Sequence, residues 1–116
     1  MPHLVVFVLG MILTLPAAAQ GSAEKGRAAY AKHGCWQCHG IEGQGSPVTS
    51  QGKVLAPDPL PLETFVAFVR SSNRAMPPYS ENVLSNEDLA DMHAYLATIP
   101  KAKDYKSIPL LERLGR

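Results

Sequence analysis

Both cysteines of the chain lie in one short string, in which Cys35 and Cys38 stand three positions apart and His39 follows directly. A disulfide between them would close a loop too short to constrain the unfolded chain much. A thioredoxin-like redox pair would require a strand-rich surrounding sequence with β-branched alternation, which is missing here. A zinc site would need a second pair of ligands with similar spacing, and the sequence has none. These three interpretations therefore fit the string poorly.

The remaining interpretation of Cys-x-x-Cys-His is the covalent attachment of a c-type haem. Two thiols three positions apart, near the end of a helix, can each add to one vinyl group of the same porphyrin. His39, the next residue, then projects its imidazole toward the iron from the proximal side. We therefore predict one haem c bound through Cys35 and Cys38, with His39 as an axial ligand of the iron.

The N-terminal segment has the pattern of a secretory signal. An apolar run from Leu4 to Leu15 is followed by a proline and three alanines, as in an h-region before a small-residue cleavage site. The run is shorter than the roughly 17 to 25 apolar residues that span a bilayer. We predict that residues 1–19 are a signal peptide cleaved after Ala19, so that the mature protein is soluble, periplasmic and not inserted in the membrane. An uncleaved N-terminal anchor is the main alternative.

The charged residues divide the rest of the chain into two segments. The net charge is only +1, which argues against wholesale nucleic-acid binding. Residues 20–100 carry a small excess of acidic side chains, whereas residues 101–116 carry an excess of basic ones. We predict one domain over 20–100 and a basic C-terminal extension over 101–116. The extension is either a solvated, partly ordered terminus or a basic arm that wraps the domain or contacts an acidic partner.

Three stretches have the apolar spacing and the end signals of helices, at about residues 22–32, 61–71 and 85–98. Ser22 can cap the first helix. The predicted buried faces are Leu62, Phe65, Val66 and Val69 in the second helix and Leu89, Met92, Leu96 and Ile99 in the third. No segment shows convincing period-2 alternation. The predicted fold class is therefore all-α.

With this motif and these helices, the chain resembles class I mono-haem c-type cytochromes over nearly all of residues 22–100. The resemblance implies a small all-α fold in which three main helices and long Gly- and Pro-rich loops wrap around one covalently bound haem. It also implies that the first and last helices cross. A glycine within a helix costs about 0.5–1 kcal/mol relative to alanine. Close backbone contact at that crossing would explain Gly26, and Tyr95 could pack its ring over it.

The resemblance further implies a methionine as the second axial ligand, in a loop before the last helix. Met76 is followed by Pro77 and matches this loop, with an ordinary packing role as the alternative. Met92 belongs to the helical stripe and is expected in the core. His33 and His93 are expected to be structural. Ligation by histidine and methionine fills both axial positions and stabilises the reduced iron, which argues against oxygen or substrate binding there.

The residues expected around the haem depart in one place from the pattern of related cytochromes. In related cytochromes a proline carbonyl accepts the second ring N–H of the proximal histidine. Lys53 stands where that proline would be expected and the nearest proline is Pro47, so we expect a backbone carbonyl at one of these two places. Leu55 and Leu60 are expected to contact the haem. Candidates for contacts with its propionates are Tyr79, Trp36 and Arg74.

The functional prediction is one-electron transfer, with no catalytic residue. The leading form is a diffusible carrier that takes electrons from a periplasmic dehydrogenase and passes them to an oxidase or another cytochrome. It would dock through an apolar patch near the haem edge, formed by Ile41, Val48, Pro77 and Pro78. The alternative is a dedicated electron-accepting subunit of a periplasmic dehydrogenase complex, with apolar residues of 101–116 buried against the partner. An enzyme or gas sensor with an open iron would require that Met76 does not bind.

Overall fold

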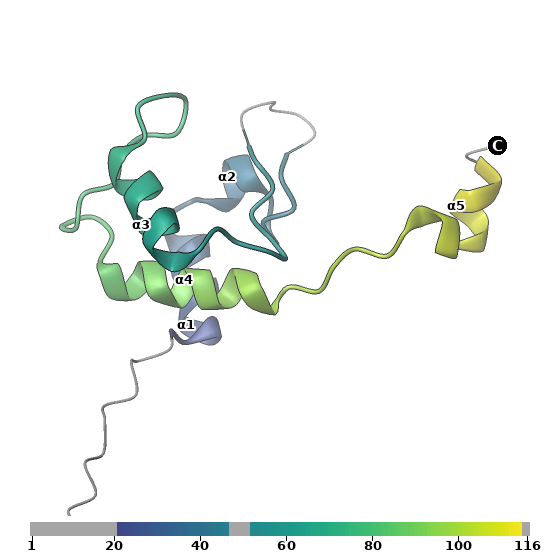
Figure 1. Cartoon of the computed structure of the whole chain (residues 1–116), viewed down its shortest axis with the longest axis horizontal. Helices are drawn as coiled ribbons and strands as arrows, with labels where there is room; N and C mark the ends of the chain where they lie inside the picture. The colour runs from purple at the N-terminus through teal and green to yellow at the C-terminus, as the bar shows by residue number, and fades with distance from the viewer. Residues whose placement is uncertain (1–20, 47–51, 115–116) are drawn as a thin grey trace, which may run out of the picture.

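A computed structural model describes residues 21–46 and 52–114 of the 116-residue chain, and this part is helical with no strand (Figure 1). The expected all-α class is therefore confirmed. The predicted signal segment 1–19 lies outside the described residues. The elements are α1 (Ala23–Lys32), α2 (Trp36–His39), α3 (Leu62–Ser71), α4 (Asn86–Thr98), the 3-10 turn η1 (Tyr105–Ser107) and α5 (Pro109–Leu114).

The helix ends follow the capping signals of the sequence. The Ser22 hydroxyl accepts a hydrogen bond from the Lys25 N–H at 3.3 Å, and Ser85 caps α4 in the same way through the Asp88 N–H at 3.0 Å. The buried carboxylate of Asp91 also accepts from the Ser22 N–H. The start of α1 is thereby tied to the middle of α4.

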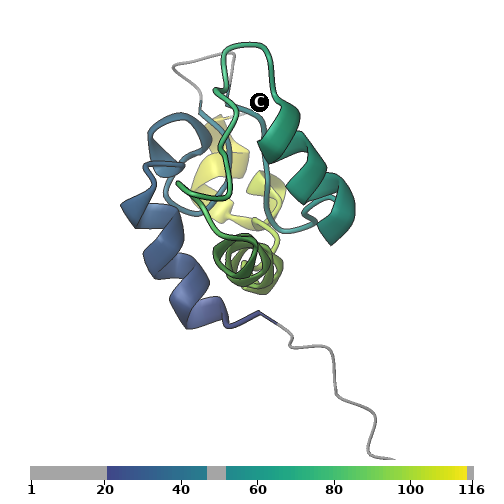
Figure 2. The same cartoon turned by 90° about the vertical axis from the view of Figure 1, so that its left-hand side faces the viewer.

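The crossing of α1 and α4 is built around Gly26. A Cβ added at Gly26 would lie 1.9 Å from the carbonyl oxygen of Asp91, so only glycine lets the two backbones approach this closely. Figure 2 shows α4 end-on, with α1 on one side and α3 on the other. The expected crossing is present. Tyr95, however, pairs with the Tyr30 ring at 5.7 Å between centroids, while the atoms nearest Gly26 belong to Asp91 and Met92.

The core lies where α4 meets α1 and α3. Leu89, Met92 and Leu96 of α4 are 2% exposed or less, as the predicted stripe requires. In α3, Phe65 and Val69 are buried and Val66 packs against the core. Leu62 is 41% exposed, so its predicted burial is wrong in this structure.

The C-terminal extension has its own local structure. Helix α5 packs against η1, and in Figure 1 this unit lies well away from α1 to α4. Leu110 and Leu114 are 61% and 76% exposed. The described part of the extension therefore does not wrap the domain. Across residues 21–46 and 52–114, no helix combines the length and the apolar character needed to cross a membrane.

Candidate haem site

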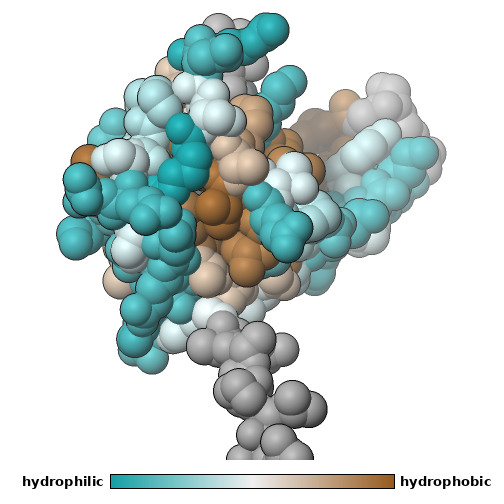
Figure 3. Space-filling model, turned by 60° about the vertical axis from the view of Figure 1, so that its left-hand side comes forward, coloured by the Kyte–Doolittle hydropathy of each residue, from teal (hydrophilic) through white to brown (hydrophobic). Residues whose placement is uncertain are grey.

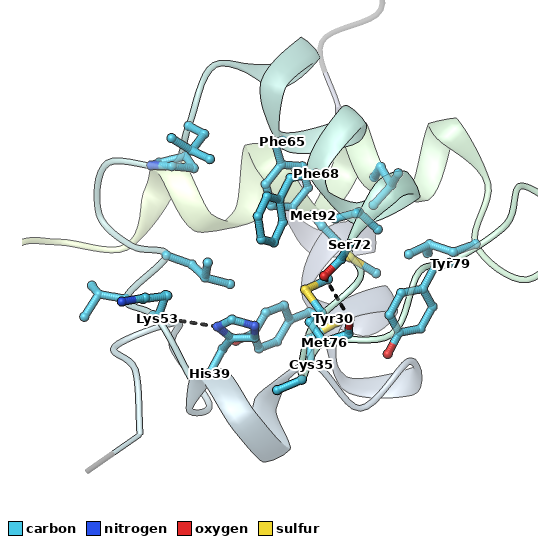
Figure 4. A pocket seen from close by; sticks show the side chains of 18 of the residues that line it. Tyr30, Cys35, His39, Lys53, Phe65, Phe68, Ser72, Met76, Tyr79 and Met92 are labelled. Carbon is cyan, nitrogen blue, oxygen red and sulfur yellow. Dashed lines mark hydrogen bonds between the residues drawn. The ribbon is translucent and has the colours of Figure 1, made fainter. Parts of the chain in front are cut away.

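A cavity of about 580 Å³ opens between α2, α3 and the loops that flank α3, with residues of α1 and α4 also in its lining. Its volume lies within the range of small-molecule and cofactor sites. Figure 3 shows apolar side chains gathered in a hollow that more polar residues surround, and Figure 4 shows the cavity from close by. Its apolar lining includes Leu55, Leu60, Phe65, Phe68, Val69, Leu84 and Leu89.

Helix α2 carries the Cys-x-x-Cys-His string beside this cavity. Cys35 is the N-cap of α2 and His39 its last residue, so that four positions separate them and both reach the cavity from one helix face. Burial raises the pKa of the Cys35 thiol. Cys38 is exposed and is not among the residues that line the cavity. Three of the four predicted site residues, Cys35, His39 and Met76, thus meet at one cavity.

The orientation of His39 is fixed by a backbone carbonyl. Its Nδ1 lies 2.8 Å from the oxygen of Lys53, and since a carbonyl can only accept, Nδ1 carries the proton (Figure 4). In the neutral ring, Nε2 is then the nitrogen that can bind iron. Of the two expected acceptor positions the structure has the one at Lys53, and Pro47 lies outside the described residues.

The loop that supplies this carbonyl lies directly against α2. A Cβ at Gly52 would lie 1.6 Å from the carbonyl oxygen of Cys38, so glycine is required for the approach. Two positions after Lys53, the Leu55 N–H donates to the Gly43 carbonyl at 2.7 Å. The loop therefore brings the Lys53 carbonyl to His39 through close backbone contacts on both sides.

We predict that Lys53→Pro stabilises the holoprotein. The Lys53 N–H donates no hydrogen bond to a described residue, so proline removes no such backbone bond and restricts the unfolded chain. The expected rise in melting temperature is about 2–8 °C. Leu55→Pro is the matched control, because it removes the bond to Gly43 and should lower the melting temperature. An unchanged or lower value for Lys53→Pro would contradict the prediction.

Met76 reaches the cavity from the loop that follows α3. It is half-buried, and the buried Ser72 hydroxyl donates to its carbonyl at 2.8 Å (Figure 4). Met92 also borders the cavity, but it is 2% exposed and belongs to the packed stripe of α4. Two thioethers are therefore near the cavity, and only Met76 sits on a loop outside the helical core.

The two other histidines of the described domain differ in their side-chain contacts. The buried Nε2 of His33 has no hydrogen-bond partner among the described residues, whereas the His93 ring has one. His93 Nε2 donates to the Leu60 carbonyl at 2.8 Å, and its ring packs edge-on against Phe65 with 5.8 Å between the ring centroids. His33 ends α1 as its C-cap. Neither lines the cavity. Within residues 21–46 and 52–114, no group of three or more His, Cys, Asp or Glu side chains could hold a metal ion.

Only two of the three polar candidates for propionate contacts lie at the cavity. Tyr79 and Arg74 line the cavity, whereas Trp36 faces a separate hollow beside Ile41. Burial, followed by the two cysteine thiols, raises the pKa of Tyr79, so that its hydroxyl remains a donor at neutral pH.

Sequence reasoning missed two aromatic residues of the lining, Tyr30 and Phe68. Burial raises the pKa of Tyr30 well above its usual value, and its hydroxyl donates to the Gly40 carbonyl at 2.8 Å. Phe68 is 55% exposed and follows Phe65 by three positions. That spacing, on the face shared with Phe65, was the available signal for Phe68.

A family model described as "Cytochrome C oxidase, cbb3-type, subunit III" matches residues 21–96. The chain belongs to this family. Its domain is a class I mono-haem c-type cytochrome, which binds haem c covalently. No curated protein and no solved structure matched the chain.

The residues present suit the haem of a c-type cytochrome. The cavity combines a cysteine and a histidine from one short helix with an apolar lining and a thioether. The hydrogen bond at His39 Nδ1 leaves Nε2 as the ring nitrogen that can bind iron when the ring is neutral. The cavity therefore offers an apolar space, one thiol and two candidate iron ligands, while the thiol of Cys38 lies outside its lining.

Proposed function

We propose that this cytochrome is a one-electron carrier whose haem c is attached through Cys35 and Cys38 and ligated by His39 and Met76. The observation that carries the proposal is that His39 and Met76 border the same cavity from separate elements. When bound, haem iron supplies one-electron exchange between its ferric and ferrous states.

In this function the protein would hold the two iron ligands in place and keep water away from the haem. The Lys53 carbonyl keeps the His39 ring in one tautomer and one orientation. The Ser72 hydroxyl fixes the backbone at Met76. Apolar side chains around the cavity limit access of water, which lowers the local dielectric and so tunes the reduction potential of a bound haem. None of these groups needs to transfer a proton or form a bond during turnover.

Carbon monoxide tests the proposal against an open-iron enzyme or sensor. The ferrous protein at neutral pH should react slowly or not at all, because His39 and Met76 would both hold the iron. Rapid binding with a full spectral change would indicate a vacant position and favour the open-iron function instead. The same sample should accept and return one electron per haem with a redox dye.

The cellular setting follows from the same proposal. Export by the predicted signal at residues 1–19 would place the cytochrome in the periplasm, between a dehydrogenase as donor and an oxidase or another cytochrome as acceptor. Pro77 and Pro78 are exposed next to Met76, as a docking patch requires, whereas Ile41, 68% exposed, lines the separate hollow beside Trp36. Val48, the other predicted patch residue, lies outside the described residues.

One observation favours the alternative function, a subunit of a periplasmic dehydrogenase complex. Helix α5 exposes leucines at Leu110, Leu111 and Leu114 and contacts η1, away from α1 to α4. Apolar surface of this kind is typical of a segment that is buried against a partner. Co-purification with a dehydrogenase would support the subunit, and a lone cytochrome would support the carrier.

Removal of residues 101–116 provides a test of the extension. We expect the shortened protein to keep its spectrum and a free energy of unfolding within about 0.5 kcal/mol of the full chain, because the extension lies apart from the domain. Denaturant unfolding of both forms measures this. A loss above 2 kcal/mol, on the order of a lost core contact, would mean that the extension packs on the domain.

A further inference from the structure

The loop that carries Met76 has few backbone hydrogen bonds of its own. Residues 73–79 form no regular element, and Pro77 and Pro78 have no N–H to donate. Two contacts tie the loop to the end of α3: Ser72 to the Met76 carbonyl, and the Tyr79 N–H to the Val69 carbonyl at 3.0 Å. A third tie comes from a charged side chain.

Arg70, in the last turn of α3, holds the far side of this loop. Its Nη1 donates to the Tyr79 carbonyl at 2.8 Å and its Nη2 to Asn86 Oδ1 at 2.7 Å. The Asn86 amide donates in turn to Glu81 Oε1 at 2.9 Å. One planar guanidinium thus joins α3, the loop after Met76 and the first turn of α4.

We propose that Arg70 is a positioning residue that holds Met76 at the iron. The inference rests on the proposed function, because it requires that Met76 is the axial ligand. Arg70 does not line the cavity, so its effect on the iron passes through the loop. Without it, the Tyr79 carbonyl loses a charge-assisted donor and the loop loses its link to Asn86. In the holoprotein, a competing ligand would then displace Met76 more readily.

Titration of the ferric holoprotein with imidazole measures how readily Met76 is displaced. Arg70→Leu should bind imidazole on the order of tenfold to hundredfold more tightly than the unaltered protein, since two hydrogen bonds to a charged group are lost. It should also weaken the charge-transfer band that methionine sulfur gives at the red edge of the ferric spectrum. Arg70→Lys, which can replace one of the two bonds, should be intermediate.

Two further measurements separate positioning from general stability. Arg27→Leu, on the exposed face of α1, changes the charge equally and should leave imidazole affinity unchanged. Hydrogen exchange at the Tyr79 amide should be faster in Arg70→Lys, which provides a readout even where Arg70→Leu fails to fold.

Failure of the inference and failure of the proposed function have different signatures. If the unaltered protein shows the methionine band and Arg70→Leu and Arg70→Lys match it in band, imidazole affinity and Tyr79 exchange, Arg70 has no positioning role. If the unaltered protein lacks the band, Met76 is not the ligand, and both the ligation and the inference are overturned.

Discussion

Replacing Met76 with alanine is expected to remove the methionine charge-transfer band of the ferric protein completely and to let the ferrous protein bind carbon monoxide rapidly. The side chain lines the same cavity as a histidine whose orientation is fixed, and no other loop methionine lies in the described domain. Loss of the thioether should also lower the reduction potential, because that ligand stabilises ferrous iron. Optical spectra with and without carbon monoxide measure these effects.

Met92→Leu is the matched control for this experiment. Met92 also borders the cavity, but it is packed within α4 at 2% exposure, and leucine nearly conserves its volume. The band should therefore persist in Met92→Leu, with a stability loss below about 1.5 kcal/mol. The opposite result, with the band lost in Met92→Leu and kept in Met76→Ala, would assign the ligand to α4 and refute the proposed ligation.

Gly26→Ala is expected to destabilise the holoprotein by about 3 kcal/mol, at the upper end of overpacking effects. The added Cβ would lie 1.9 Å from the Asp91 carbonyl oxygen, so that α1 and α4 would have to separate. Helix propensity alone predicts the opposite sign, a gain of about 1 kcal/mol. Denaturant unfolding decides between the two effects by the sign of the change.

Ala28→Gly measures the effect of helix propensity alone on the free energy of unfolding. Ala28 is exposed on the same helix, so its replacement should cost about 1 kcal/mol without affecting the crossing. If Gly26→Ala stabilised the protein by a similar amount, the close backbone contact at the crossing would be refuted.

Much of the fold was predictable because its signals are local. Ser22 and Ser85 cap the helices that follow them, and the apolar stripe of α4 is buried as its spacing predicts. Gly26 was informative for a different reason: a residue that is poor for a helix indicates a tertiary contact that excludes every side chain. Leu62 shared the spacing of its helix face but lies in the first turn of α3, where it remains 41% exposed.

The residues that carry the chemistry of the site were predictable from the sequence, whereas the groups that orient them were less so. The spacing of Cys35 and His39 indicated one helix face, and both line the cavity. The acceptor for the His39 ring is a backbone carbonyl at Lys53, and every residue has such a carbonyl, so the side chain could not identify it. Arg70 was missed for the same reason, since its partner at Tyr79 is a carbonyl in an irregular loop.

The central claim is that one haem, attached at Cys35 and Cys38, exchanges a single electron while His39 and Met76 occupy both axial positions. A potentiometric titration of the exported holoprotein, followed by its optical spectrum, tests this most directly. The account predicts one reversible one-electron transition, with the methionine band present only in the oxidised form. A colourless folded protein, or an oxidised spectrum without the methionine band, would contradict it.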